Sequence, residues 1–149
     1  MIEKFNIRVY GLLINENNEV LVTDEYEFGK EFTKFPGGGL ELGEGLKDGL
    51  IREWKEELNQ EIEVLNHFYT TDFFQQSGFN EKHQLISVYY LVKTNFKFTV
   101  KISQIPFDFE NRNAEEVISF RWIKLDHMLP SQLTFPIDKL VSEMLLAKQ

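Results

Sequence analysis

The sequence contains no cysteine. Neither a disulfide framework nor a thiolate metal site is therefore possible. The chain also has no run of about 18 apolar residues, so we expect no membrane-spanning segment. Residues 1–11 lack the long apolar core of a secretory signal peptide. These absences predict a cytoplasmic protein that has no membrane partner.

Positive charge is scarce. The chain has 16 lysine and arginine residues against 24 aspartate and glutamate residues, which gives a net charge of −8. A nucleic acid polymer would be repelled, and the sequence shows no basic stripe to bind one. A small phosphorylated substrate would be repelled too, unless metal ions accompany it. The charge balance thus favours a metal-assisted small-molecule site over nucleic-acid binding.

Apolar residues are plentiful. The chain has 149 residues, 42% of them hydrophobic, including 14 phenylalanines. This suffices for a core and excludes a disordered chain. We expect a single domain, 1–149, acting as a monomer or homodimer. Alternation and turn residues predict strands and two helices. The expected strands are 5–14, 19–23, 33–35, 61–74, 84–92 (a central one), 96–102 and 117–123, and the helices are 46–58 and 136–148.

The most informative segment is 37–58, a glycine-rich turn followed by a helix with clustered acidic residues. Glu53, Glu56 and Glu57 fall within about 100° of arc, because positions three and four apart are neighbours on a helix. They lie at the edge of the apolar stripe, near the boundary between core and cleft. Carboxylates gathered in this way repel one another unless a cation lies among them. The stripe consists of Leu46, Leu50, Ile51, Trp54 and Leu58.

The segment has a second interpretation, a solvated surface helix whose ion pairs involve Lys47, Arg52 and Lys55. The glycine turn and the position of the glutamates at the edge of the apolar stripe argue against it, and Gly49 adds a further hint. A glycine inside a helix costs about 1 kcal/mol relative to alanine. Its missing side chain would let the glycine turn pack against the carboxylate side of the helix. We therefore favour a site for a divalent metal and a phosphate-bearing substrate.

The spacing of these residues resembles the signature of the Nudix hydrolases, G-x5-E-x7-R-E-U-x-E-E-x-G-U, where U is a bulky aliphatic residue. Gly38 begins the match, Glu44 follows after five residues, and Arg52 after seven more. Glu53, Glu56 and Glu57 complete the charged positions. Three positions depart from the pattern without changing a charge: Trp54, Asn59 and Gln60. Asparagine is the next best residue after glycine for a left-handed helix cap, so we expect the turn after the helix to be kept.

The resemblance implies an α+β fold of the Nudix type, an α/β/α sandwich with a mixed β-sheet between helices. It implies hydrolysis of a pyrophosphate bond in a nucleoside diphosphate derivative, such as a nucleoside triphosphate or a nucleotide sugar, with Mg²⁺ or Mn²⁺. Glu53 and Glu57 would bind metal, and Glu56 would be a further ligand or the general base. A carbonyl of Gly37 or Gly38 would add a ligand. Arg52 would orient the carboxylates, through Glu44.

Outside the signature, family members often supply another acidic residue from a later loop. Glu116 is the first choice here by its spacing to the end of the strand 117–123, and Glu115 is the second. The general base is then Glu53, Glu56 or Glu116, and a solvated loop pair is the alternative for the two loop residues. Phe74 and Phe79 either stack on a nucleobase or belong to the core.

Substrate choice is the least determined property. A proline about 15 residues after the signature marks ADP-ribose hydrolases in the family, and residues 72–78 contain none. This speaks mildly against ADP-ribose. A second function stays open: a Nudix-fold module that senses a nucleotide or sugar phosphate without catalysis. Such modules usually lose signature glutamates, whereas this chain keeps all of them, so the sequence favours the enzyme.

Overall fold

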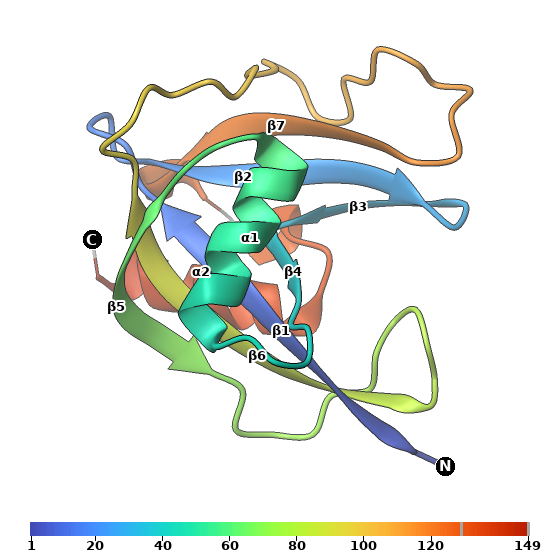
Figure 1. Ribbon diagram of the computed structural model, residues 1–149. Helices are drawn as coiled ribbons and strands as arrows, with labels where there is room; N and C mark the ends of the chain where they lie inside the picture. Colours follow the sequence, from blue (N-terminus) through green and yellow to red (C-terminus); the bar gives the residue numbers. More distant parts are fainter. Residues whose placement is uncertain (129, 149) are drawn as a thin grey trace. The chain divides into compact units, whose positions relative to one another are not determined.

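A computed structural model describes residues 1–128 and 130–148. The contacts divide the chain into two compact units that alternate along the sequence. The first unit comprises Met1–Leu12 and Gly37–Thr99, and the second comprises Leu13–Pro36 and Val100–Gln149. Each unit contains one sheet and one α-helix (Figure 1). The whole signature segment therefore belongs to the first unit.

The sheet of the first unit has four strands in the order β4-β1-β6-β5. They are β1 (Lys4–Leu13), β4 (Gly37–Gly39), β5 (Glu63–Thr70) and β6 (His83–Lys93). β6 lies inside the sheet, as its nearly continuous apolar sequence predicts. The glycine-rich turn is itself an edge strand, antiparallel to β1, with Gly38 opposite Val9. The glycine backbone is thus held in place by the sheet.

Helix α1 (Leu46–Leu58) has the predicted bounds and packs against β4 and β5 (Figure 1). Leu50, Trp54 and Leu58 are buried, which confirms most of the apolar stripe. The prediction for Ile51 is wrong, because it is exposed; it lies about 100° around the helix from Leu50. Asn59 ends the helix with φ 50° and ψ 37°, and its N–H donates to the carbonyl of Lys55. The expected left-handed cap is therefore confirmed.

The sheet of the second unit has three strands in the order β3-β2-β7, both pairs antiparallel. They are β2 (Glu19–Glu27), β3 (Lys30–Lys34) and β7 (Val117–Lys124), followed by the short 3-10 turns η1 (Leu125–His127) and η2 (Pro130–Gln132) and by helix α2 (Pro136–Ala147). β2 continues four residues beyond the predicted end at Thr23. Two charged residues of this extension have cationic partners within the sheet, Asp24 with Arg121 and Glu25 with Lys34.

The strand expected at 96–102 is not formed. The backbone N–H of Thr99 donates to the Oε1 atom of Gln60, at 2.9 Å, instead of to a neighbouring strand. The amide of Gln60 in turn donates to the carbonyls of Glu61 and Lys97. Gln60 is fully buried, so the polar side chain at this signature position does not weaken the core. The Gln60 side chain bonds to the backbone of Lys97 and Thr99, in the segment where the strand was predicted.

Strands with two helices place the chain in the α+β class, as predicted, and the strands are divided between two sheets. Within the part of the chain that the structure describes, no helix has both the length and the apolar character needed to cross a membrane.

Candidate active site

Arg52 of α1 holds Glu44 in a two-pronged ion pair. Its Nε donates to Oε2 of Glu44 at 2.9 Å, and its Nη2 donates to Oε1 at 2.6 Å. The same Nη2 donates to the carbonyl of Gly39 at 3.0 Å. A forked pair of this kind fixes geometry as well as charge. Arg52 therefore ties the helix both to the loop before it and to strand β4.

The remaining nitrogen of Arg52 bridges two other glutamates of the signature. Nη1 donates to Oε1 of Glu53 at 3.0 Å and to Oε2 of Glu56 at 3.1 Å. The side chain of Arg52 is 21% exposed and that of Glu53 13%, whereas Glu56 is 59% exposed. Lys55 pairs with Glu61 instead, at 3.9 Å. Arg52 thus lies at the centre of a network of ion pairs, whereas an ordinary surface salt bridge joins only two side chains.

Two glycines allow the close approach of α1 and the glycine strand. A Cβ at Gly38 would lie 2.4 Å from Oε2 of Glu53, and a Cβ at Gly49 would lie 2.7 Å from Cδ1 of Leu40 and 2.9 Å from Oε1 of Glu44. All three distances are too short for real contacts, so a side chain at either position would force Glu53, or Leu40 and Glu44, to move. At Gly49 the neighbours are the side chains of Leu40 and Glu44, whereas the sequence predicted contact with the glycine turn itself. At Gly38, the missing side chain lets the Glu53 carboxylate rest against the backbone of β4.

The ion pair shifts the acidity of its members. The hydrogen bond from Arg52, followed by one from the backbone N–H of Glu41, lowers the pKa of Glu44 from 4.5 to about 2. The hydrogen bond to Glu44 raises the pKa of Arg52 above its ordinary value. Glu44 is therefore a permanently charged anchor for Arg52 and cannot serve as a proton donor near neutral pH.

This shift predicts a measurable pH dependence. A carboxyl whose pKa falls on folding stabilises the native state above pH 4.5, and the contribution is lost as the pH drops toward 2. We expect Glu44 to titrate near pH 2 in a carboxyl-detected NMR titration. Arg52→Met should return its pKa toward 4.5, whereas Lys55→Met, which removes another cation of the helix, should not. A Glu44 pKa near 4.5 in the unsubstituted protein would contradict the ion pair.

The signature segment offers carboxylate and backbone carbonyl oxygens to a divalent metal. Carboxylates and backbone carbonyls are the oxygen ligands that Mg²⁺ and Mn²⁺ prefer, so the chemistry fits. Within residues 1–128 and 130–148, however, no three aspartate, glutamate or histidine side chains gather closely enough to hold a metal ion. Arg52 takes the position of the cation between Glu53 and Glu56. The metal-binding roles of Glu53, Glu56, Glu57, Gly37 and Gly38 therefore stay predictions.

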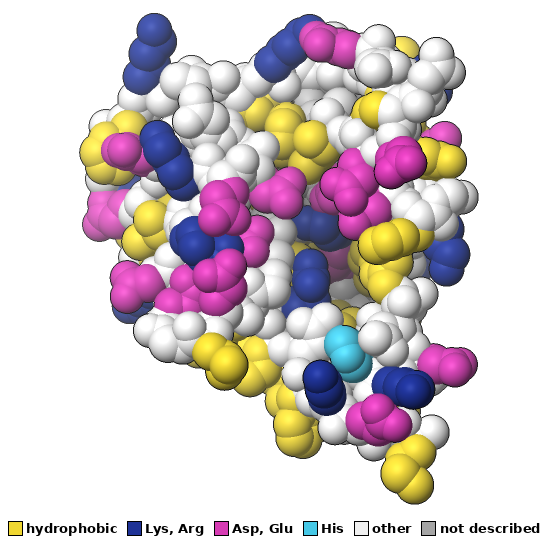
Figure 2. Space-filling view, turned by 45° about the vertical axis from the view of Figure 1, so that its right-hand side comes forward, with side chains coloured by type: hydrophobic (Ala, Val, Ile, Leu, Met, Phe, Trp, Pro, Cys, Tyr) yellow, Lys and Arg dark blue, Asp and Glu magenta, His cyan; other side chains and the backbone are white. Residues whose placement is uncertain are grey.

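The other predicted site residues lie in different surroundings. Glu57 is exposed on the last turn of α1. Phe74 and Phe79 are exposed residues of the first unit, so the core interpretation is wrong for both. Glu116 belongs to the second unit, where it and Glu115 line a cavity. Their roles in binding metal or substrate stay predictions. On the face drawn in Figure 2, acidic side chains gather in groups with lysine and arginine side chains among them.

Sequence reasoning missed two participants. The carbonyl of Gly39 accepts from Arg52, and Leu40 fills the space beside Gly49. Backbone acceptors leave no signal in side-chain patterns, so Gly39 could not have been found. Gly49, a glycine inside the helix, indicated that another residue packs closely against it. Leu40, the apolar residue that follows the glycine strand, was a candidate for that residue.

Comparisons with known proteins agree with this fold. The family model described as NUDIX domain matches residues 4–144. Nudix hydrolase 5 of Arabidopsis thaliana is 26% identical over 123 residues, which cover 80% of this chain and 36% of that protein. The chain thus spans about a third of that relative's length.

Solved structures show the same fold at low identity. The MutT protein from Methanosarcina mazei Go1 has a TM-score of 0.72 and 18% identity, covering 99% of this chain and 97% of the other. A NUDIX hydrolase from Nitrosomonas europaea has a TM-score of 0.69 and 16% identity, covering 96% and 89%. Since the family model covers nearly the whole sequence, this chain belongs to the NUDIX domain family.

Proposed function

We propose that this chain is a Nudix pyrophosphohydrolase, which uses a divalent metal to hydrolyse the pyrophosphate bond of a nucleoside diphosphate derivative. One observation carries the proposal furthest. All charged positions of the signature are present, and Arg52 contacts three of them, Glu44, Glu53 and Glu56. A module that had lost catalysis would have no need for this set of charges.

Pyrophosphate resists water because its anionic oxygens repel a nucleophile. A bound Mg²⁺ or Mn²⁺ supplies charge neutralisation and lowers the pKa of a water molecule. Glu53, Glu56 and Glu57 would hold it, with a carbonyl of Gly37 or Gly38. Glu116 of the second unit is a further candidate ligand.

The chain's own residues would position the carboxylates and accept the proton of the attacking water. The forked contact with Glu44 fixes Arg52, and Arg52 orients Glu53. Glu56 is mostly exposed and has only Arg52 as an ion-pair partner among the described residues, so it can exchange that partner for a metal. Glu53, Glu56 and Glu116 remain the candidates for the general base that accepts a proton from the attacking water.

Exposed aromatic rings support a nucleotide-derived substrate. Phe74 and Phe79 are exposed rings of the first unit, so either can stack on a nucleobase. A nucleoside triphosphate or a nucleotide sugar satisfies this chemistry. The net charge of −8 favours a small substrate that arrives with its metal, and a cytoplasmic location is part of the proposal.

The test is turnover by the full chain. The protein is incubated with Mg²⁺ and, separately, with nucleoside triphosphates, nucleotide sugars, ADP-ribose and dinucleoside polyphosphates, and the products are separated by chromatography. We expect cleavage of at least one class, its loss with EDTA, and its return with added Mg²⁺ or Mn²⁺. Tight binding of one class without turnover of any would favour the sensing module instead. Turnover that survives Glu53→Gln together with Glu57→Gln would contradict the site.

A further inference from the structure

The second unit contains a cavity, and the proposed hydrolysis uses only Glu116 of the residues that line it. Its volume is about 410 Å³, and it lies between the end of the β2–β3 hairpin and the loop before β7. The hairpin contributes Tyr26, Glu27, Phe28 and Gly29, and the loop contributes residues 112–116. This is enough space for a small organic molecule.

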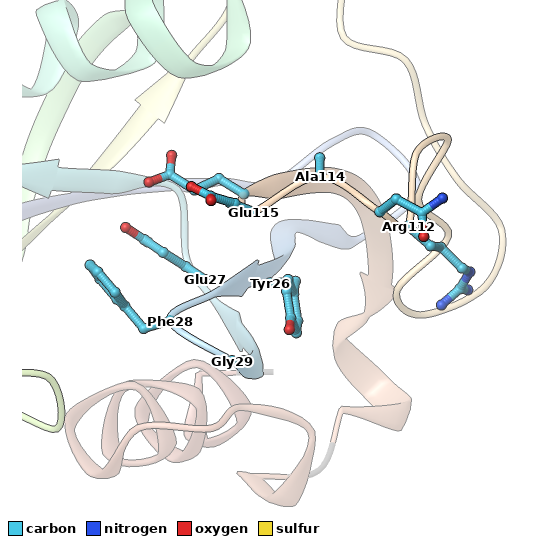
Figure 3. Close-up of a pocket in the computed structure, with 9 residues that line it drawn as sticks. Tyr26, Glu27, Phe28, Gly29, Arg112, Ala114 and Glu115 are labelled. Carbon is cyan, nitrogen blue, oxygen red and sulfur yellow. The ribbon is translucent and has the colours of Figure 1, made fainter.

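The walls of the cavity are aromatic on the hairpin side. Phe28 is 73% exposed, which is unusual for a large apolar side chain, and Tyr26 lies two residues before it. In Figure 3 the side chains of Glu27, Phe28 and Glu115 extend in the same direction from the hairpin and the loop. An aromatic face next to two carboxylates attracts positive charge, because the ring face carries partial negative charge.

Acidic residues outnumber basic residues in the lining of the cavity. Three glutamates line it, Glu27, Glu115 and Glu116, against one cation, Arg112. Nη2 of Arg112 donates to the carbonyl of Phe107 at 2.9 Å, and its guanidinium lies 5.9 Å from the ring centre of Phe109. Figure 3 shows Arg112 extending away from the glutamates. Among the described residues, neither Glu115 nor Glu116 makes a hydrogen bond or ion pair with another side chain.

These observations select one class of ligand. An organic ammonium ion needs only an aromatic face and nearby negative charge. We propose that this cavity binds a small organic cation through its ammonium group, with the Phe28 ring on one side and the carboxylates of Glu27 and Glu115 on the other. The proposal does not depend on the proposed hydrolysis.

The test compares a cation with its neutral isostere. The isotope-labelled full chain is titrated with choline in the presence of EDTA and monitored by two-dimensional NMR; 3,3-dimethyl-1-butanol, which replaces nitrogen by carbon, is titrated in parallel. We expect saturable shifts of the amides at 26–29 and 112–116 with choline, and binding about tenfold weaker for the isostere. Because EDTA removes divalent metal, failure here leaves the test of hydrolysis unaffected, and the reverse also holds.

Single substitutions test which residues of the cavity bind choline. Glu115→Gln and Phe28→Gly should each weaken choline binding by about five- to tenfold. Glycine is chosen because Phe28 has φ 53°, a conformation that glycine adopts without strain. Glu16→Gln removes an exposed charge elsewhere in the same unit and should change nothing. Equal binding of choline and the isostere, shifts that map outside the cavity, or no saturable shift would each overturn the proposal.

Discussion

Replacing Glu53 by glutamine is expected to lower kcat by about 10²–10³-fold, the loss typical when one preorganised electrostatic contact is removed from a transition state. The amide keeps the shape of the side chain and removes its charge. Glu53 is 13% exposed, and its Oε2 faces Gly38. The measurement is steady-state turnover of the best substrate with Mg²⁺, together with the affinity for Mn²⁺, which should weaken in parallel.

The matched control is Glu61→Gln, which neutralises an exposed glutamate just after the same helix. We expect it to retain full activity. Thermal unfolding of Glu53→Gln should change little, because its carboxylate is one of several partners of Arg52. Unchanged kcat would remove Glu53 from the reaction, and a large drop in melting temperature would show that the loss of activity reflects unfolding.

The parts of the fold that follow from local rules were predictable. Helix α1 has the expected bounds, because a periodic apolar stripe, a preceding glycine and a left-handed asparagine cap all indicate the same segment. The prediction of a strand at 96–102 was wrong because the conformation of this segment depends on a distant partner, the buried amide of Gln60. The predicted length of β2 was wrong for a similar reason. The predicted strand ended at Thr23, just before Asp24 and Glu25, whose cationic partners lie elsewhere in the chain.

The candidate site was predictable where spacing along one helix determines it. Arg52, Glu53 and Glu56 meet because they lie within one turn of each other, and Glu44 joins them as the resemblance implied. A contribution from Glu116 requires knowledge of another segment, and helical spacing carries no information about it. The same limit applies to Phe74 and Phe79, since exposure depends on what the remainder of the chain covers.

Replacing Asp24 by asparagine is expected to destabilise the protein by about 3–5 kcal/mol, the cost of breaking a buried ion pair at one end. Asp24 is fully buried. Arg121 donates to both of its oxygens, at 2.6 and 3.1 Å. Thr33 Oγ1 and the backbone N–H of Phe107 also donate to Asp24. The charge of Asp24 thus joins β2, β3, β7 and the loop before β7, and its removal leaves the arginine without a carboxylate.

The measurement is the free energy of unfolding in urea, with a thermal midpoint expected to fall by about 6–20 °C. The double variant Asp24→Asn/Arg121→Met removes both charges while an amide oxygen remains for Thr33. It should recover most of the loss, because an apolar replacement of a buried pair is often neutral. Thr33→Val, which removes one neutral donor to Asp24, should cost only about 1 kcal/mol. A loss for Asp24→Asn no larger than that for Thr33→Val would show that the charge contributes no more than an ordinary hydrogen bond. A double variant as unstable as the single one would show that the unpaired guanidinium is not the cause.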